Sequence, residues 1–204
     1  MKKEQLLASV MSEHRIGRDI IQAFKSINRE NFVPEELKSQ AYYDIPLPLK
    51  EGATISQPTT VLLMLQYLEI NKGNKILEIG SGSGYNAALI SKLVGQKGKI
   101  VSVEIDEGLV DFAKNNLKKE NIRNVKVVLG DGSKGYIKES PFDRIIVTAA
   151  VQEVPEALMK QLKLNGILLA PVGSTLSQEL IKFRKLKKEI EVEYLGTFSF
   201  VPLR

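Results

Sequence analysis

The sequence has no cysteine among its 204 residues and only one histidine, His14. Without cysteine there is no disulfide framework, no thiolate metal site and no cysteine nucleophile. A single histidine leaves little room for a histidine-rich metal centre or a serine–histidine triad. We therefore expect no metal site and a chemistry that uses neither a thiol nor a triad.

Long hydrophobic segments are also missing. No apolar stretch approaches the ~20 residues that a membrane-spanning helix needs, and the N-terminus lacks the apolar centre of a signal peptide. The contents of 43% apolar and 26% charged residues are typical of globular proteins. We expect a cytoplasmic protein with a single domain over residues 1–204, in which residues 1–55 form an N-terminal helical and loop appendage.

The formal net charge of +5 is spread thinly along the chain. The densest basic segment, residues 182–188, is followed at once by Glu189, Glu191 and Glu193. This pattern favours the two solvated edges of a hairpin over a nucleic-acid-binding stripe. We expect no nucleic-acid partner and no membrane association.

From Lys75 onward, strand-like and helix-like segments alternate. The predicted strands cover residues 75–79, 99–104, 125–129, 143–147 and 166–172, and the predicted helices cover 85–94, 107–119 and about 153–162. Helices are also expected at 3–11, 17–27 and from Pro58 to about 68. Such alternation predicts an α/β fold of the Rossmann-like type, with a mostly parallel sheet and helices on both faces. Residues 179–196 alternate like an antiparallel hairpin, which predicts an antiparallel C-terminal edge.

A glycine-rich loop, Glu78-Ile79-Gly80-Ser81-Gly82-Ser83-Gly84, leaves the first of these strands and opens a helix. Such a turn brings backbone close to a ligand at the carboxyl ends of parallel strands. Nicotinamide sites prefer G-x-G-x-x-G, whereas the third glycine here comes one position earlier. Glu78 would repel a pyrophosphate and suits a positively charged ligand. E-x-G-x-G-x-G resembles motif I of the S-adenosylmethionine-dependent methyltransferases.

Two further carboxylates follow strand ends. Glu104 closes the second strand, where a carboxylate can accept hydrogen bonds from both ribose hydroxyls. Asp131, within Gly130-Asp131-Gly132, follows the third strand, although an aspartate there is more often a turn or capping residue. Three acid-bearing strand ends in this order favour the methyltransferase interpretation more than any one of them alone.

The methyl acceptor follows by elimination. Methylation of cytosine C5 needs a cysteine, and the residues after the fourth strand, Thr148-Ala149-Ala150-Val151, do not form the Asn/Asp-Pro-Pro-Tyr motif of adenine methylation. No candidate general base for an alcohol or amine is evident. A carboxylate, with an ordinary pKa of ~4, is already ionised at neutral pH and removes this requirement.

More specific motifs lie on both sides of the glycine loop: Arg29-Glu30-Asn31-Phe32-Val33-Pro34, Ala41-Tyr42-Tyr43-Asp44, Thr54-Ile55-Ser56-Gln57-Pro58 and Phe200-Val201-Pro202-Leu203. Together with the loop they resemble the protein-L-isoaspartate O-methyltransferase family from about residue 15 to the last residue. The resemblance implies methyl transfer from S-adenosyl-L-methionine to the free carboxyl of L-isoaspartyl residues in damaged proteins and peptides, a protein-repair activity. It implies isoaspartyl-containing proteins and peptides as partners, and we favour a monomer.

The same resemblance implies the residues of the site. Ser56 is the catalytic residue, although a serine before Pro58 also fits a helix N-cap. The implied cofactor-binding residues are Ala53, Thr54, Ile55, Ser56, Glu78, Gly80, Ser81, Gly82, Ser83, Glu104, Ile105, Asp131 and Gly132. Val201 lies where the family receives an extended peptide.

Other functions stay open at this point. The same scaffold could methylate a small acid or RNA, because a fold does not settle the substrate. A methyltransferase-like binding module without turnover is a second alternative, against which the intact glycine loop, Glu104 and Asp131 argue. A nicotinamide dehydrogenase ranks last because the glycine spacing of this sequence does not fit the nicotinamide motif.

Overall fold

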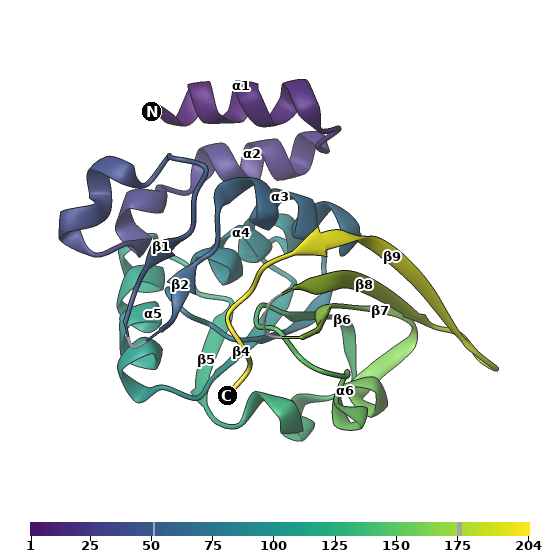
Figure 1. Ribbon diagram of the computed structural model, residues 1–204. Coiled ribbons are helices and arrows are strands. Elements are labelled where there is room, and N and C mark those ends of the chain that lie inside the picture. Colours follow the sequence, from purple (N-terminus) through teal and green to yellow (C-terminus); the bar gives the residue numbers. More distant parts are fainter. Residues whose placement is uncertain (51, 175–176) are drawn as a thin grey trace.

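The structure, a computed structural model, describes residues 1–50, 52–174 and 177–204. Its centre is a seven-stranded sheet with the order β5-β4-β3-β6-β7-β8-β9 (Figure 1). The first five strands in this order run parallel, and β8 runs antiparallel to both of its neighbours. The strands are β3 (Lys75–Ile79), β4 (Lys99–Glu104), β5 (Val125–Leu129), β6 (Phe142–Val147), β7 (Leu162–Gly173), β8 (Gln178–Lys185) and β9 (Ile190–Phe198). The predicted fold class is confirmed.

Helices cover the two faces of the sheet unequally. On one face α3, α4 and α5 lie against the strands, with α1 and α2 stacked outside them, whereas α6 lies on the other face (Figure 1). The helices are α1 (Lys3–Glu13), α2 (Arg18–Ser26), α3 (Pro58–Tyr67), α4 (Tyr85–Val94), α5 (Glu107–Lys119) and α6 (Glu156–Gln161). Among the described residues, no helix has both the length and the apolar character needed to cross a membrane.

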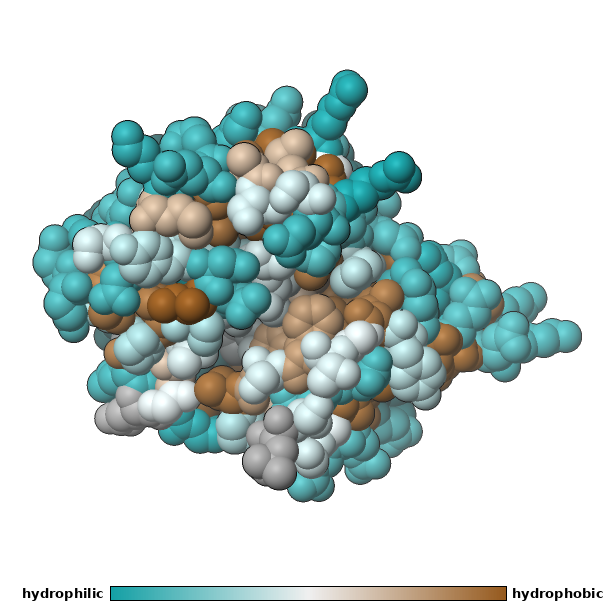
Figure 2. All heavy atoms as spheres, turned by 45° about the horizontal axis from the view of Figure 1, so that its top comes forward, coloured by the Kyte–Doolittle hydropathy of each residue, from teal (hydrophilic) through white to brown (hydrophobic). Residues whose placement is uncertain are grey.

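Short elements complete the chain. Four 3-10 helices are present in the described ranges: η1 (Arg29–Phe32), η2 (Glu35–Gln40), η3 (Gly132–Lys134) and η4 (Ile137–Glu139). The strands β1 (Leu47–Pro48) and β2 (Thr54–Ile55) form a separate antiparallel pair ahead of α3. The β8–β9 hairpin projects from the body of the molecule, and its tip carries hydrophilic side chains (Figure 2).

The core consists of two apolar layers, one on each face of the sheet. On β3, Ile76 packs into the layer beneath α3 to α5, while Leu77 and Ile79 pack into the opposite layer. Because both faces are covered, the central strands are almost continuously apolar. Leu6 of α1 and Phe24 of α2 belong to the same cluster as Ile76, so the N-terminal helices share the core of the sheet.

Most predicted elements coincide with observed ones. The bounds of β3, β4, β5, α4 and α5 are those expected from the sequence. The helix α6 is shorter than predicted and begins at Glu156, directly after Pro155. Proline fits the start of a helix but lacks the N–H that a helix interior needs. The strand β7 begins at Leu162, four residues earlier than predicted.

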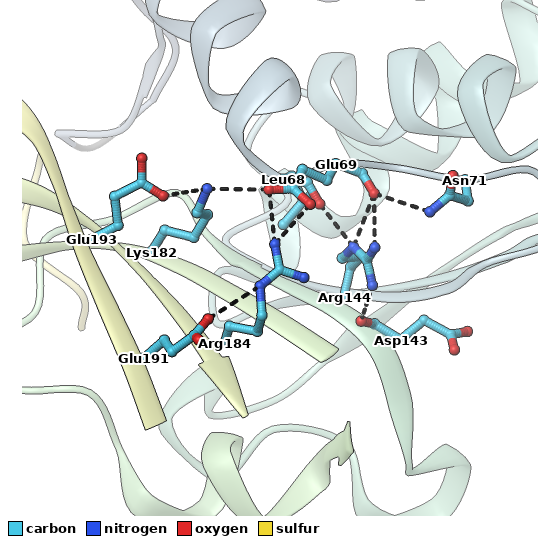
Figure 3. Close-up of polar contacts among 9 residues, drawn as sticks. All are labelled: Leu68, Glu69, Asn71, Asp143, Arg144, Lys182, Arg184, Glu191 and Glu193. Atoms are coloured by element: carbon cyan, nitrogen blue, oxygen red, sulfur yellow. Dashed lines mark hydrogen bonds and ion pairs between the residues drawn. The ribbon is translucent and has the colours of Figure 1, made fainter. Parts of the chain in front are cut away.

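The C-terminal end of α3 is fixed to the sheet by a polar network (Figure 3). Arg144 on β6 is 8% exposed, and its guanidinium donates to the carbonyl oxygens of Leu68 and Glu69 at 2.8 Å. The Glu69 carboxylate accepts in turn from Arg184 at 2.8 Å and from Lys182 at 3.1 Å, both on β8. These bonds satisfy carbonyl groups that a helix end leaves without partners.

We expect Arg144→Met to lower the free energy of unfolding by about 1–3 kcal/mol, because it leaves the buried carbonyl group of Leu68 without its side-chain donor. Urea unfolding measures this loss. The matched control is Glu191→Gln, which removes only the exposed contact to Arg184 at 3.7 Å and should cost less than about 1 kcal/mol. Equal losses in the two variants would mean that Arg144 does not anchor α3.

Candidate active site

A cleft runs along the carboxyl ends of the parallel strands and consists of two adjoining hollows. The first hollow is open to solvent and contains about 640 Å³ of space that protein atoms do not fill, the open solvent at its mouth included. It is lined by residues that follow β4, β5 and β6 and by the C-terminal segment. The second hollow lies between β2, α3 and the start of α4. Both share Thr54, Gly80 and Thr148 in their walls.

All the predicted site residues except Glu78 and Asp131 line these hollows. Ala53, Gly82, Glu104, Ile105 and Gly132 line the first hollow, and Ile55, Ser56, Ser81 and Ser83 line the second. Val201 also lies in the wall of the first hollow. The fold thus gathers residues that are as far apart in the sequence as Ala53 and Val201.

The glycine loop needs its glycines for two different reasons. A Cβ atom on Gly80, which has a φ of +91°, would lie 2.5 Å from the hydroxyl oxygen of Thr148. Gly82 has a φ of +50°, and the nearest atom to its Cβ position is a Leu49 methyl carbon at 3.6 Å. Positive φ values strain residues that carry a Cβ atom. Gly80 therefore allows the loop to pass Thr148, and Gly82 allows a backbone conformation that residues with a Cβ atom rarely adopt.

Glu104 ties the glycine loop to the end of β4. Its carboxylate accepts from the backbone N–H groups of Gly82 and Ile105 at 2.9 Å and of Asp106 at 3.2 Å. The residue is 8% exposed and forms no ion pair within the described part of the chain. A carboxylate has about four acceptor positions, so Glu104 retains capacity for a hydroxyl donor in the first hollow.

Glu78 lies beneath the loop instead of in the cleft wall. Its side chain is fully buried and accepts from Asn86 at 2.8 Å and from the hydroxyl of Ser102. Burial raises the pKa of Glu78 to about 7, and the nearby charge of Glu104 adds to this shift. Asn86, at the start of α4, lines the second hollow. Glu78 can therefore reach a ligand only indirectly, through Asn86 and the loop.

Asp131 makes the local contacts of a turn residue. Its carboxylate accepts from the backbone N–H of Ser133 at 3.0 Å and from the Ser133 hydroxyl at 2.6 Å, and it pairs with Lys134 at 3.0 Å. The hydrogen bond from Ser133 holds the pKa of Asp131 below its ordinary value. These contacts place Gly132 in the cleft wall, where Asp131 itself is absent.

Ser56 does not cap α3, so the capping interpretation is wrong. The N-cap residue is Gln57, and the helix has no side-chain cap of its own. Asp44 instead accepts from the backbone N–H of Thr59 at 2.9 Å and from its hydroxyl at 2.7 Å. The Ser56 hydroxyl makes no hydrogen bond to the residues that the structure describes, and Ser56 lines the second hollow.

Several cleft residues were not predicted from the sequence. Thr148, in both walls, donates from its hydroxyl to the carbonyl oxygen of Gly80 at 2.7 Å. The C-terminal segment crosses the strand ends, and Ala150 exchanges backbone hydrogen bonds of 2.8 Å with Val201 and Leu203. Thr148, which follows β6, contacts the glycine loop after β3 because these two strands are neighbours in the sheet. The order of the strands, which the sequence does not state, is needed to predict this contact.

The donor and acceptor groups of the cleft fit S-adenosylmethionine. The first hollow has a buried carboxylate, that of Glu104, which forms no ion pair among the described residues and suits hydroxyl donors. No group of three or more histidine, cysteine or acidic side chains in the described ranges could hold a metal ion. With the sheet order and the E-x-G-x-G-x-G loop, these features define a Rossmann-like S-adenosylmethionine-dependent methyltransferase.

Comparison with known proteins identifies the family. The family model for protein-L-isoaspartate(D-aspartate) O-methyltransferase matches residues 1–204, and the chain belongs to this family. The protein-L-isoaspartate O-methyltransferase of Ignicoccus hospitalis is 44% identical over 99% of this chain and 97% of that protein. Protein-L-isoaspartate O-methyltransferase 2 of Archaeoglobus fulgidus is 40% identical over 100% of this chain and 93% of that protein.

Solved structures agree with this assignment. A protein-L-isoaspartate O-methyltransferase structure superimposes with a TM-score of 0.88 at 36% identity, over 98% of this chain and 65% of that chain. A putative member from Plasmodium falciparum, solved in complex with S-adenosyl-L-homocysteine, gives a TM-score of 0.86 at 26% identity over 99% and 97% of the two chains. The predicted family, its enzyme class and its S-adenosylmethionine cofactor are confirmed.

We expect Glu104→Ala to weaken binding of S-adenosylhomocysteine by about 1–3 kcal/mol, the scale for losing hydrogen bonds to a charged group. Isothermal calorimetry measures the dissociation constant. The control is Glu107→Ala, which removes an exposed carboxylate from the first turn of α5 and should leave the constant unchanged. An unaltered constant in folded Glu104→Ala protein would remove Glu104 from the site.

A second prediction concerns the buried carboxyl of Glu78, with a pKa of about 7 against an ordinary value of 4.5. The unfolded chain loses this proton at lower pH than the folded chain, so the contribution of Glu78 to stability is fully present below about pH 4.5 and lost as pH rises to about 7. Glu78→Gln has no such proton. As the pH rises through this window, its unfolding free energy should therefore increase relative to that of the wild type, by up to ~3 kcal/mol. Parallel pH curves for the two proteins would contradict the shifted pKa.

Proposed function

We propose that the two hollows together hold S-adenosylmethionine along the strand ends and that Ser56 faces the methyl acceptor. The reaction is that of the family to which the chain belongs: methyl transfer from S-adenosylmethionine to the free carboxyl of L-isoaspartyl residues in damaged proteins and peptides, a step of protein repair. When bound, the cofactor supplies a methyl group on a positively charged sulfonium sulfur.

Binding falls to residues of both hollows. In the first hollow, Glu104 would accept hydrogen bonds from the ribose hydroxyls, and Ile105 and Gly132 would border the adenine. In the second hollow, Ser81 and Ser83 lie at the start of α4, where free backbone N–H groups and the helix dipole favour the anionic end of an amino acid. Glu78 holds Asn86 and the loop in place from below.

One observation carries the choice of acceptor: the wall of the second hollow has no general base. Within the described residues it is formed by serine, threonine, asparagine, tyrosine, glycine and apolar side chains. Burial raises the pKa of Tyr85, its one titratable side chain, far above neutrality. An alcohol or amine acceptor would need a group to take its proton. A carboxylate is ionised before it arrives and needs none.

Ser56 would then orient the acceptor without exchanging a proton. Its hydroxyl lies in the wall of the hollow and is not engaged elsewhere in the described structure. A hydroxyl can donate one hydrogen bond to a carboxylate oxygen. Catalysis reduces to alignment of the carboxylate with the methyl group and to partial exclusion of water.

The proposal also covers the class of partner, the cellular location, the oligomeric state and the domain organisation. The protein acts as a cytoplasmic monomer on proteins and peptides, and not on nucleic acid. The densest basic segment supports the latter point, because Lys182 and Arg184 form ion pairs with Glu69, Glu191 and Glu193. The apolar cluster shared by α1, α2 and the sheet supports a single domain over residues 1–204, in which the helices of residues 1–55 pack into the core of the sheet.

The activity is tested with two synthetic peptides of one sequence, one containing L-isoaspartate and the other L-aspartate at the same position. We expect methyl ester to form on the isoaspartyl peptide and only at background level on its twin. Methylation of a free dicarboxylic acid or of RNA at a rate equal to that of the isoaspartyl peptide would favour the broader alternative function.

The role of Ser56 is tested with Ser56→Ala. Loss of one positioning hydrogen bond should lower kcat by roughly 10-fold or more, while the dissociation constant for S-adenosylhomocysteine changes by less than about threefold. The control is Ser83→Ala in the same hollow, where cofactor affinity should fall more than kcat. Normal turnover in Ser56→Ala would exclude the assigned role.

A further inference from the structure

Two sequence motifs have no part in the cleft walls: Arg29-Glu30-Asn31-Phe32-Val33-Pro34 and Ala41-Tyr42-Tyr43-Asp44. Both belong to the segment before α3, and both contribute a charged side chain that contacts residues 56–59. Arg29 donates to the carbonyl oxygen of Ser56, and Asp44 accepts from the backbone N–H of Thr59. Ser56, which faces the cleft, lies beside these two contacts in the chain.

Arg29 is held in an unusual environment for a charge. It is 0% exposed, and its guanidinium donates to the carbonyl oxygens of Ala41 and Ser56, each at 2.8 Å. Its carbon Cζ lies 4.9 Å from the centre of the Tyr85 ring, and Nη1 has no partner among the described atoms. No ion pair to Arg29 forms within the described chain. Removing such a charge from water is costly, so simple filling of space does not account for arginine here.

Asp44 makes the second contact, at the start of α3. Its two carboxylate oxygens accept from the backbone N–H and the hydroxyl of Thr59. Pro58 at the first position of α3 has no N–H, which makes the Thr59 N–H the first free donor of the helix. A cap usually comes from the N-cap residue itself. Here it comes from a residue 15 positions earlier, and the N-cap residue Gln57 makes no side-chain cap of its own.

We propose that Arg29 and Asp44 are positioning residues that form a clamp on residues 56–59 and fix the Ser56 hydroxyl toward the methyl acceptor. This inference rests on the proposed role of Ser56. The clamp holds the backbone at Ser56 and at Thr59. Loss of either contact would allow the Ser56 hydroxyl to change its orientation. Misplacement of a catalytic group by about 1 Å can cost about 100-fold in rate.

The test is a double-mutant cycle between Asp44→Ala and Ser56→Ala. In the wild-type background we expect Asp44→Ala to lower kcat by about 10–100-fold, with the dissociation constant for S-adenosylhomocysteine changed by less than about threefold. In the Ser56→Ala background the same substitution should lower kcat by less than about twofold, because the group that it positions is already absent. Asp44→Asn keeps an oxygen acceptor for Thr59 and should restore most of the turnover.

Two controls separate the clamp from a general effect on the fold. Asp19→Ala removes an exposed aspartate from the first turn of α2 and should change neither kcat nor affinity. Arg29→Met should show the same dependence on Ser56 as Asp44→Ala. Because removal of a buried arginine can prevent folding, the Asp44 variants carry the test independently, with circular dichroism as the check.

The outcomes distinguish this inference from the proposed function. If Ser56→Ala lowers turnover but Asp44→Ala does not, the clamp is overturned and the role of Ser56 stands. Equal losses from Asp44→Ala in both backgrounds would make Asp44 structural and also overturn the clamp. If Ser56→Ala itself has no effect, the role of Ser56 falls and the clamp falls with it.

Discussion

The carboxylate of Glu104 joins two parts of the cleft wall. It accepts from Gly82 in the glycine loop and from Ile105 and Asp106 after β4. The loop after β3 and the turn after β4 are neighbours only because the two strands run parallel and in register. Parallel strands end at one edge, and this constraint gathers the glycine loop, the Glu104 carboxylate and the residues after β5 and β6.

The two hollows differ in the charge of the side chains that line them. Charge is confined to the wall of the first hollow, where Glu104 suits hydroxyl donors, whereas the second has only neutral groups around Ser56. A neutral wall serves a reaction between a carboxylate and a sulfonium, because the reactants bring their own opposite charges. The protein then has to align them and to limit water around them. In the proposed mechanism, Ser56 and the contacts that hold it perform this alignment.

Local sequence predicted the parts of this structure that depend on local physics. The apolar strand of residues 75–79 and the helix of residues 85–94 were expected with their observed bounds, because buried parallel strands and glycine loops have strong patterns. Tertiary contacts decided the rest. Glu78 turns under the loop toward Asn86, and Thr59 takes its cap from Asp44. No pattern within a few residues of either position carries this information.

The central claim is that the acceptor is ionised before it meets Ser56, so that no protein base takes part. The most direct measurement is the single-turnover rate of methyl transfer to an isoaspartyl peptide between about pH 5 and 9, with circular dichroism at each point. The account predicts a rate that is flat above the carboxyl titration at about pH 4–5. Because Glu78 itself has a pKa of about 7, the profile is measured in Glu78→Gln as well. A titration between about pH 6 and 8 that persists in both folded proteins would reveal a general base and contradict the account.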